Sequence, residues 1–506
     1  MSERIVAIIR KVNSFLNGIV WGWPVIILIL ATGLLLSVRT GFLQVRRFKD
    51  SLASTIVPAI RGLGKKNKSR SDNSVSQFEA FATAISGTVG TGNIVGVISA
   101  ILTGGPGAVL WMWISAFFGM VTNYSENVLG LYFRKKNQNG ELSGGAFYYI
   151  ANGLKWRWLA YVAAVFCLLA SVGMSGVQTN KISGSVSGAL DKAFGLSDPA
   201  LVKFIISAVV AGFTGVIILG GIKRIGRVAS MLVPFMSLLF ITLSVIAICM
   251  HIGNVPGAFG LIFSKAFTFK AAGGGVLGYT FASVIRKGMA RGVFSNEAGL
   301  GSSVIANSAS ETREPVKQGL WGVFEVFLDT FVICTLTSLT FLTTFDMSSL
   351  SGAENDTEMA ITMFETNFGS FGVAVYSVIL PMFAFTSVLA WAYYGEKATE
   401  FCFGRLGDRG SKAAVTVFKS IYILLIAAST FITSDLVWEI DDTFNGLMAI
   451  PNLICLVALS GLVGRITRNY YDRQNGKKPE PMLSAYPDLN EEFKHDMEAQ
   501  AASESG

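Results

Sequence analysis

The chain has 506 residues, of which 51% are hydrophobic and only 15% are charged, and its mean hydropathy is +0.52. A soluble domain carries about 25% charged residues, so this composition excludes an ordinary soluble protein and indicates lipid as the surrounding solvent. The five cysteines lack paired spacing and the two histidines are far apart. Neither a disulfide framework nor a zinc or haem site is indicated, and we expect no cofactor.

In chain order, eleven apolar stretches are long enough to cross a bilayer. They are predicted at 19–38, 78–102, 107–133, 157–178, 200–221, 228–250, 273–294, 318–345, 370–394, 413–433 and 443–463. The first continues past the dozen apolar residues of a signal peptide and lacks a small-residue cleavage site, which favours a retained span. We therefore predict an all-α polytopic membrane protein with about 11 transmembrane helices.

Basic residues are distributed unevenly around these spans. Nine lie in the loop 39–77, namely Arg39, Arg46, Arg47, Lys49, Arg61, Lys65, Lys66, Lys68 and Arg70, and three precede the first span, namely Arg4, Arg10 and Lys11. Because basic loops remain in the cytoplasm, the N-terminus is predicted outside and the C-terminus inside the cell. The net charge of +8 is then an orientation signal that needs no nucleic-acid partner. We expect a multi-pass protein of the bacterial or archaeal inner membrane.

Two of the spans are interrupted by glycine. The second contains Ser86-Gly-Thr-Val-Gly-Thr-Gly-Asn93, and the seventh opens with Gly273-Gly-Gly275. Each glycine costs a helix about 1 kcal/mol relative to alanine, and an opened helix persists in hydrocarbon only where it lines a polar cavity. For a single glycine-rich span, close helix packing is the better explanation. Here the two breaks begin two sets of five spans that enter the membrane from opposite sides, which predicts a transporter built from an inverted repeat.

This layout divides the chain into four parts. Residues 1–77 hold an extra N-terminal helix and the basic cytoplasmic loop, 78–253 the first repeat, 254–465 the second repeat, and 466–506 a cytoplasmic tail that we expect to be solvated. Each repeat contains five spans and begins with one of the interrupted helices.

An opened helix offers the groups that an amino-acid zwitterion and a sodium ion need. Free backbone N–H groups and the positive end of a half-helix favour a carboxylate, whereas freed carbonyls and hydroxyls suit a hard cation. Thr88, Thr91 and Asn93 place further oxygens at the same depth. Near the expected break of the seventh span, the buried hydroxyl of Thr280 needs a partner. Its neighbour Phe281 is explained at least as well by core packing.

One acidic residue is predicted near mid-membrane. Asp329 lies about eleven residues into the eighth span, where a charged side chain costs about 3 kcal/mol by insertion scales. One interpretation makes it a cation-site or coupling residue. The other makes it half of a structural ion pair with Arg286 or Arg291 of the neighbouring span. The sequence leaves both open.

Six segments resemble one known family in the order in which they occur. They are Gly87–Gly96, Gly104–Trp113, Arg291–Ser302, Glu325–Thr330, Phe385–Gly395 and Phe444–Asn452. The similarity extends from about residue 15 to 465 and is to the sodium:alanine/glycine cation symporters. It implies a leucine-transporter-like fold, coupling to sodium or in some members to protons, and substrates such as alanine, glycine or glutamine.

The resemblance also implies roles for individual residues. Amides near Thr91 and Gly92 would hold the substrate carboxylate, and Trp391 would close the pocket. With the residues near the seventh break, the expected substrate-binding set is Thr91, Gly92, Gly173, Ser175, Gln178, Phe281, Ser387 and Trp391. The expected sodium-binding set is Ser86, Thr88, Val89, Asn93, Thr280, Thr386 and Ser387, with Asp329 as a candidate coupling residue.

We therefore expect a secondary active transporter that carries sodium and a small neutral amino acid into the cell by alternating access. A proton-coupled symporter of the same fold is the alternative. A channel would take its filter from a ring of subunits, and a membrane enzyme would need a nucleophile–base pair or metal cluster that the histidines and cysteines do not supply. The oligomeric state is open, with a monomer as the expectation.

Overall fold

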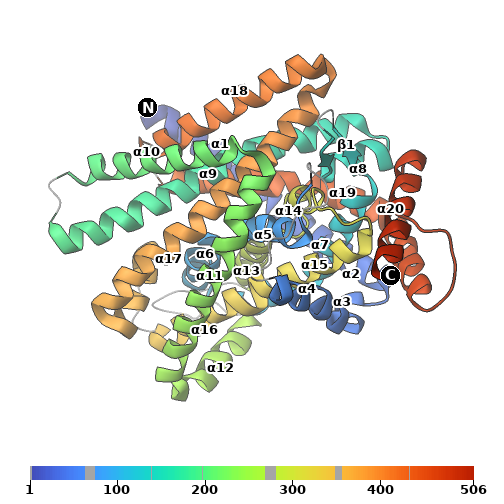
Figure 1. The fold of residues 1–506 in the computed structure, drawn as a ribbon. Coiled ribbons are helices and arrows are strands. Elements are labelled where there is room, and N and C mark those ends of the chain that lie inside the picture. Colours follow the sequence, from blue (N-terminus) through green and yellow to red (C-terminus); the bar gives the residue numbers. More distant parts are fainter. Residues whose placement is uncertain are drawn as a thin grey trace.

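The computed structural model of the protein describes residues 3–62, 74–137, 140–195, 198–267, 281–347, 356–431 and 434–505. Helices make up most of these ranges, and the one sheet within them has two short strands (Figure 1). The expected all-α polytopic architecture is confirmed. The glycine run Gly273–Gly275 and Thr280 lie outside the described residues.

The first half of the chain contains the interrupted second span. Four helices precede it: α1 (Glu3–Val20), α2 (Trp23–Thr40), α3 (Leu43–Arg46) and α4 (Phe48–Gly62). The interrupted span comprises α5 (Gln77–Thr88), the short turn η1 (Thr91–Asn93) and α6 (Val95–Gly104). It is followed by α7 (Ala108–Tyr132), the antiparallel strands β1 (Lys135–Lys136) and β2 (Leu142–Ser143), α8 (Ala146–Gly153), α9 (Arg157–Phe194), α10 (Pro199–Ile218), α11 (Gly221–Met250), η2 (Ile252–Asn254) and α12 (Val255–Ala266).

The second half continues with α13 (Phe281–Asn296) and α14 (Ser303–Asn307). The eighth predicted span is α15 (Pro315–Val326), the π-helical segment η3 (Phe327–Cys334) and α16 (Thr335–Thr344). The remaining elements are α17 (Asp356–Phe403), η5 (Gly404–Leu406), α18 (Gly407–Ala428), η6 (Ser429–Phe431), α19 (Ser434–Gln474) and α20 (Pro487–Ser505). Within α17, Gly369 has the left-handed value φ 61° and bends the helix beside the predicted start of the ninth span.

Seven stretches of the described chain are long and apolar enough to cross a membrane. One of them, Asp356–Phe431, contains both the ninth and the tenth predicted span. Three predicted spans are not among these seven stretches, namely 78–102, 107–133 and 273–294. The first is broken into two short helices. In the second, α7 carries polar residues such as Asn123 and Glu126 along its length, and in the third the described helix α13 has only 16 residues. The count of eleven therefore stays a prediction.

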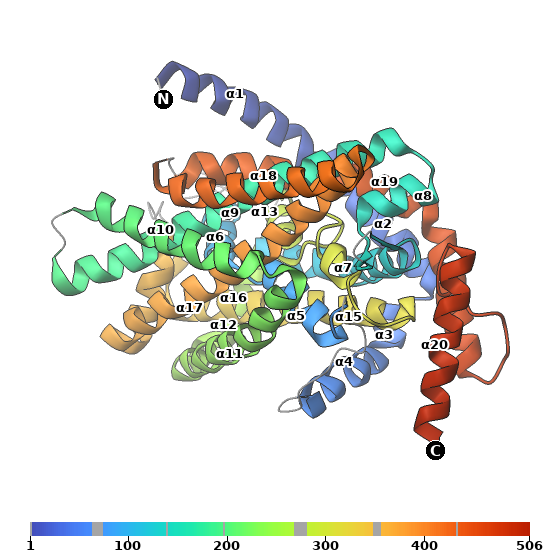
Figure 2. The same cartoon turned by 45° about the horizontal axis from the view of Figure 1, so that its top comes forward.

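The interrupted span is enclosed by helices from both halves of the sequence. α5 packs against α11 and α17 and also contacts α14 and α15 (Figure 2). Around it, α9 packs against α17 and α19, and α7 packs against α13 and α15. The additional N-terminal span α2 packs on α19 and α7. Residues more than 200 positions apart therefore meet at the break, which positions the candidate site.

The C-terminal tail is mostly exposed or half-buried, but two of its apolar side chains are buried. Leu483 and Phe493 are fully buried. The guanidinium groups of Arg134 and Arg313 lie over the Phe493 ring, 5.2 and 4.6 Å from its centroid. Arg313 also pairs with Asp496 at 2.8 Å. The mixed charge of the tail suggested a solvated segment, but its few apolar residues find a partner surface on the loops that follow α7 and α14.

Replacing Phe493 by alanine is expected to release this tail. Replacing a buried phenylalanine by alanine removes about 3 kcal/mol of stabilisation. The form in which α20 is detached from the rest of the protein should therefore become about 100-fold more populated, and limited proteolysis of the tail should become correspondingly faster. The matched control is His495→Ala, an exposed position on the same helix, which should leave the cleavage rate unchanged. Equal cleavage rates in Phe493→Ala and the parent protein would show that the ring does not anchor α20.

Candidate cation and substrate site

The second span opens directly after Thr88. A capping box begins α5, in which Glu79 N donates to Ser76 Oγ and the Glu79 carboxylate accepts from Ser76 N. The helix ends because the next two residues are extended, with φ/ψ of −80°/91° at Val89 and −135°/−151° at Gly90. α6 resumes after the η1 turn. The predicted opening of this helix is confirmed.

Asn93 ties the opening to two other spans. Its side-chain oxygen accepts a hydrogen bond from Gly90 N at 2.9 Å, which satisfies an amide that the helix break has freed. Its side-chain nitrogen donates to Asp329 Oδ1 at 2.5 Å and to Ser295 Oγ at 2.9 Å. Thr337 Oγ1 donates to the Asn93 carbonyl at 2.8 Å. Asn93 therefore lies where the break, α13 and the η3–α16 segment meet.

Asp329 is fully buried and is held by neutral donors. Besides Asn93, Ser295 Oγ donates to Asp329 Oδ2 at 2.9 Å and Thr330 Oγ1 donates to the same oxygen at 2.8 Å. Among the described residues, no basic side chain contributes to its surroundings as an ion-pair partner. A buried carboxylate with only neutral neighbours is costly unless a cation or a proton neutralises it.

The structural ion pair that was an alternative explanation for Asp329 is contradicted. Arg291 pairs instead with Asp442 at 3.5 Å. Arg286 donates from Nε to the Trp21 carbonyl at 3.1 Å. Both arginines of the neighbouring helix are thus engaged elsewhere, and the role of Asp329 in a cation site stays a prediction.

The extended residues of the break face α9 and α17. Thr91 N donates to Gln178 Oε1 at 3.4 Å, and Ser387 Oγ donates to the Ser86 carbonyl at 2.9 Å. A Cβ atom at Gly90 would lie 2.6 Å from Ser387 Oγ and 3.0 Å from Gln178 Nε2. Glycine is needed here because any side chain would prevent this close approach.

The other expected sodium-binding residues lie on α5 and α17. Ser86, Thr88 and Val89 are buried, and their carbonyls lie where the hydrogen-bond ladder of α5 ends. Thr386 is also buried, but its hydroxyl donates to the Phe383 carbonyl of its own helix at 3.0 Å. The proximity of Ser387 to the break was predicted, whereas the orientation of Thr386 was not. Their sodium-binding roles stay predictions.

The other expected substrate-binding residues are spread more widely. A Cβ at Gly92 would touch the Phe294 ring, and a Cβ at Gly173 would touch Asp441. The Ser175 hydroxyl donates to the Val172 carbonyl. The Trp391 ring lies edge-on to Tyr394, and the Phe281 ring lies edge-on to Trp111. The contact of Phe281 fits its interpretation as a packing residue. Within the described contacts, Thr91 and Gln178 are thus joined directly at the break, whereas Phe281 packs against α7.

Three polar side chains at this site were not predicted from the sequence. Ser295 and Thr330 donate to Asp329, and Cys334 Sγ lies 3.4 Å from Asn93 Nδ2. Ser295 and Thr330 belong to segments that resemble the symporter family, so a signal for them existed. Cys334 had none, because the π-helical geometry of η3 that brings it to the same cluster has no simple sequence signature.

Together these groups form an enclosed cluster rich in oxygen. It contains the Asp329 carboxylate, the Asn93 amide and the hydroxyls of Ser295 and Thr330. The described residues hold no group of three His, Cys, Asp or Glu side chains suited to a metal ion. Oxygen ligands with a single negative charge suit a hard monovalent cation better than a transition metal.

An interrupted helix that meets spans of both halves at a buried polar cluster defines a polytopic membrane transporter of the leucine-transporter-like fold, not an enzyme. The particular family follows from the sequence match: the chain belongs to the Sodium:alanine symporter family over residues 6–484.

Individual relatives agree with this assignment. The Sodium/alanine symporter AgcS of Methanococcus maripaludis is 38% identical over 477 residues, which cover 94% of this chain and 99% of the relative. The Probable sodium/glutamine symporter GlnT of Bacillus subtilis is 34% identical over 477 residues and 93% of each chain. The crystal structure of MhsT in complex with L-phenylalanine matches with a TM-score of 0.54 at 15% identity, covering 79% of this chain and 99% of that one. This structural likeness shows the fold alone.

Proposed function

We propose that the protein is a sodium-coupled symporter that carries a small neutral amino acid, alanine or glycine with glutamine as a further candidate, into the cell. The observation that carries this proposal is the buried Asp329 carboxylate, which is bonded to Asn93 of the interrupted helix and has no basic partner among the described residues. Membership of the family, and relatives named for alanine and for glutamine, support the substrate class.

Sodium binding would organise the break before the amino acid arrives. A cation beside Asp329 would neutralise the carboxylate and hold Asn93, which in turn holds Gly90 N. The carbonyls at the end of α5 and the Ser387 hydroxyl supply oxygens for a second ion. Each positive charge that moves inward through 100 mV contributes about 2.3 kcal/mol, enough to accumulate a substrate tens of fold.

The groups beside the break suit a neutral amino acid. Thr91 N makes only a long hydrogen bond of 3.4 Å to Gln178 Oε1, so a substrate carboxylate can replace this acceptor. Gln178 offers a neutral amide for the rest of the zwitterion. Ser175 on the same helix leaves room for a side chain longer than that of alanine, which favours testing glutamine as well.

The larger organisation of the proposal follows from the interrupted helix. Residues 78–253 and 254–465 would form the two inverted repeats, and rocking of one against the other would expose the site to each side in turn. The basic loop 39–77 would face the cytoplasm of a cell whose inner membrane holds the protein. We treat the monomer as the transporting unit.

Uptake into proteoliposomes tests the proposal. Labelled alanine should accumulate saturably when an inward sodium gradient is imposed and should stop accumulating when sodium is replaced by potassium. A panel of unlabelled amino acids then ranks alanine, glycine and glutamine as competitors. Sodium-independent uptake would remove sodium coupling, and the absence of competition by all three amino acids would remove the substrate class.

Proton coupling is the second candidate because a proton also neutralises a buried carboxylate such as Asp329. An inward proton gradient imposed without sodium separates the two. Sodium coupling predicts no accumulation of alanine under that condition, whereas proton coupling predicts accumulation equal to that in the presence of sodium.

Replacing Asn93 by alanine is expected to raise the sodium concentration for half-maximal uptake about tenfold. The variant loses the hydrogen bond to Asp329, and a bond to a charged group contributes about 1.5–3 kcal/mol. The control is Asn254→Ala, which removes an amide that donates to the Thr343 carbonyl beside η2 and should leave the sodium dependence unchanged. Sodium titrations that coincide for Asn93→Ala and the parent protein would count against Asn93 as part of the cation site.

A further inference from the structure

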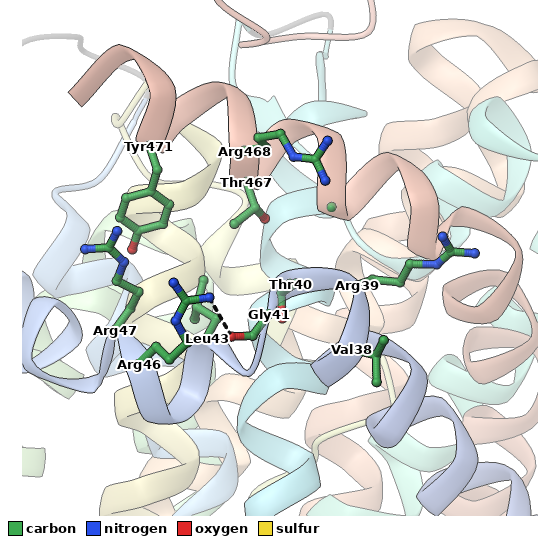
Figure 3. Close-up of a pocket in the computed structure, with 11 residues that line it drawn as sticks. Val38, Arg39, Thr40, Gly41, Leu43, Arg46, Arg47, Thr467, Arg468 and Tyr471 are labelled. Atoms are coloured by element: carbon green, nitrogen blue, oxygen red, sulfur yellow. Dashed lines mark hydrogen bonds between the residues drawn. The ribbon is translucent and has the colours of Figure 1, made fainter. Parts of the chain in front are cut away.

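A basic pocket lies between the C-terminal ends of α2 and α19. Its volume is about 320 Å³, and its lining includes the four arginines Arg39, Arg46, Arg47 and Arg468 but no acidic residue (Figure 3). The arginines come from two segments more than 400 residues apart in sequence and line the same pocket, with the Arg39 side chain directed away from Arg46 and Arg47 (Figure 3).

The backbone shapes this pocket. α2 ends in a left-handed glycine, Gly41 with φ 68°, after which the chain turns into α3. α19 can approach α2 closely because Gly464 has no side chain. A Cβ at this position would lie 2.9 Å from the Arg39 carbonyl oxygen. The two helices thus touch just above the hollow, and α3 forms its other wall (Figure 3).

Among the described residues, three of the four guanidinium groups have no acidic partner. Within the described residues, Arg47 pairs with Asp50 at 3.3 Å, whereas no ion pair involves Arg39, Arg46 or Arg468. Arg46 donates only to the Gly41 carbonyl, at 3.4 Å. Arg47 is held against the Tyr471 ring, 4.2 Å from its centroid. The pocket therefore carries an excess of positive charge on three exposed arginines and one that is held against an aromatic ring, which suits a phosphate group.

Exposed aliphatic side chains lie on α2 and α19, and one of them, Val38, lines the pocket. On α2, Leu34 and Val38 are one turn apart and are 49% and 61% exposed. On α19, Ile454 and Val457 lie on the face that Gly464 continues, and they are 36% and 38% exposed. Exposed aliphatic side chains beside a cluster of arginines match the two ends of a phospholipid, with acyl chains on the helices and the headgroup in the pocket.

We propose that this pocket binds the headgroup phosphate of an anionic phospholipid, with Arg39, Arg46 and Arg468 as its main ligands. The site is separate from the interrupted helix, so the proposal does not depend on the transported substrate. The arginines suit a ligand that carries a singly charged phosphate group. The exposed aliphatic side chains beside the pocket favour a lipid over free phosphate, because they can contact its acyl chains.

The test uses the purified, delipidated full chain in detergent, titrated with phosphatidylglycerol or phosphatidylcholine and observed by native mass spectrometry. Phosphatidylglycerol is expected to bind at least about tenfold more tightly than phosphatidylcholine. The triple variant Arg39→Gln/Arg46→Gln/Arg468→Gln should bind it about 100-fold more weakly, since each basic residue near a lipid surface contributes roughly fivefold. The control is Lys223→Gln/Arg224→Gln/Arg227→Gln, three exposed basic residues of α11, which should leave binding unchanged.

Several outcomes would overturn the proposal. Equal binding of the two lipids, or an equal loss of binding in both triple variants, would show that the arginine pocket does not select the headgroup. Displacement of the lipid by inorganic phosphate at equal concentration would show a site for a free anion. If the triple variant unfolds, the single variant Arg468→Gln should still bind phosphatidylglycerol about fivefold more weakly, and unchanged binding there would again contradict the proposal.

Discussion

Asp329→Asn is expected to reduce sodium-driven alanine uptake about 100-fold, which corresponds to about 2.8 kcal/mol. The substitution removes one negative charge from a fully buried position and keeps the shape of the side chain, but it replaces one acceptor oxygen by an NH2 donor. A unit charge about 4 Å from a cation contributes about 4 kcal/mol at an effective dielectric constant of about 20. The expected loss is therefore within what a single carboxylate can supply.

Two measurements make this prediction specific. Exchange of labelled for unlabelled alanine at saturating sodium should fall less than gradient-driven uptake, because the proposed substrate contacts at Thr91 and Gln178 are unchanged. Glu325→Gln removes another buried carboxylate of the same span, one bonded to Asn123 and Asn307 instead of to the interrupted helix. It should keep the parent sodium dependence. Wild-type sodium dependence in Asp329→Asn would exclude this carboxylate from the cation site.

Gly90→Ala is expected to reduce uptake by at least about tenfold without unfolding the protein. The new Cβ would lie 2.6 Å from Ser387 Oγ, so the serine must rotate and lose its bond to the Ser86 carbonyl. It would also lie 3.0 Å from Gln178 Nε2 and push this amide away from Thr91 N. Overpacking of a close-packed site costs about 1–3 kcal/mol, and here the displaced groups are those proposed to bind the ion and the substrate.

Gly96→Ala is the matched control for this prediction. Gly96 is a buried glycine of α6, a few residues from Gly90, but a Cβ there would meet no atom within 4 Å. Its substitution should leave uptake unchanged and raise helix stability by up to about 1 kcal/mol. Thermal unfolding and size-exclusion profiles establish that both variants are folded. Equal uptake by the two variants would show that the contact at Gly90 is not required for transport.

Local features of the sequence were enough to predict the membrane class and the position of the break. The length of an apolar stretch can be read from consecutive residues, and glycine lowers the stability of a helix wherever it occurs. The opening between Thr88 and Asn93 could therefore be placed from an eight-residue segment. The segments that resemble the symporter family also predicted the fold, because they occur in the same order over most of the chain. The number of spans stays a prediction, since α7 has membrane length but carries buried polar residues, and the described part of α13 has only 16 residues.

Contacts between distant segments could not be predicted in the same way. The sequence left Asp329 equally suited to a cation site and to an ion pair with Arg286 or Arg291. Only the tertiary structure excluded the ion pair, because it places Asn93 against the carboxylate and gives both arginines other partners. The cation-site role stays a prediction.

The sequence by itself therefore determined that this protein lies in a membrane, that its second span is broken at Gly87–Asn93, and that it resembles the symporters to which it belongs. The tertiary structure decided which groups surround Asp329, how the tail is anchored by Phe493, and that arginines from α2, α3 and α19 share one pocket. The physical reason is that hydropathy and helix propensity act between neighbours in the chain. A buried charge, in contrast, is stabilised by whatever the fold brings within a few ångströms of it.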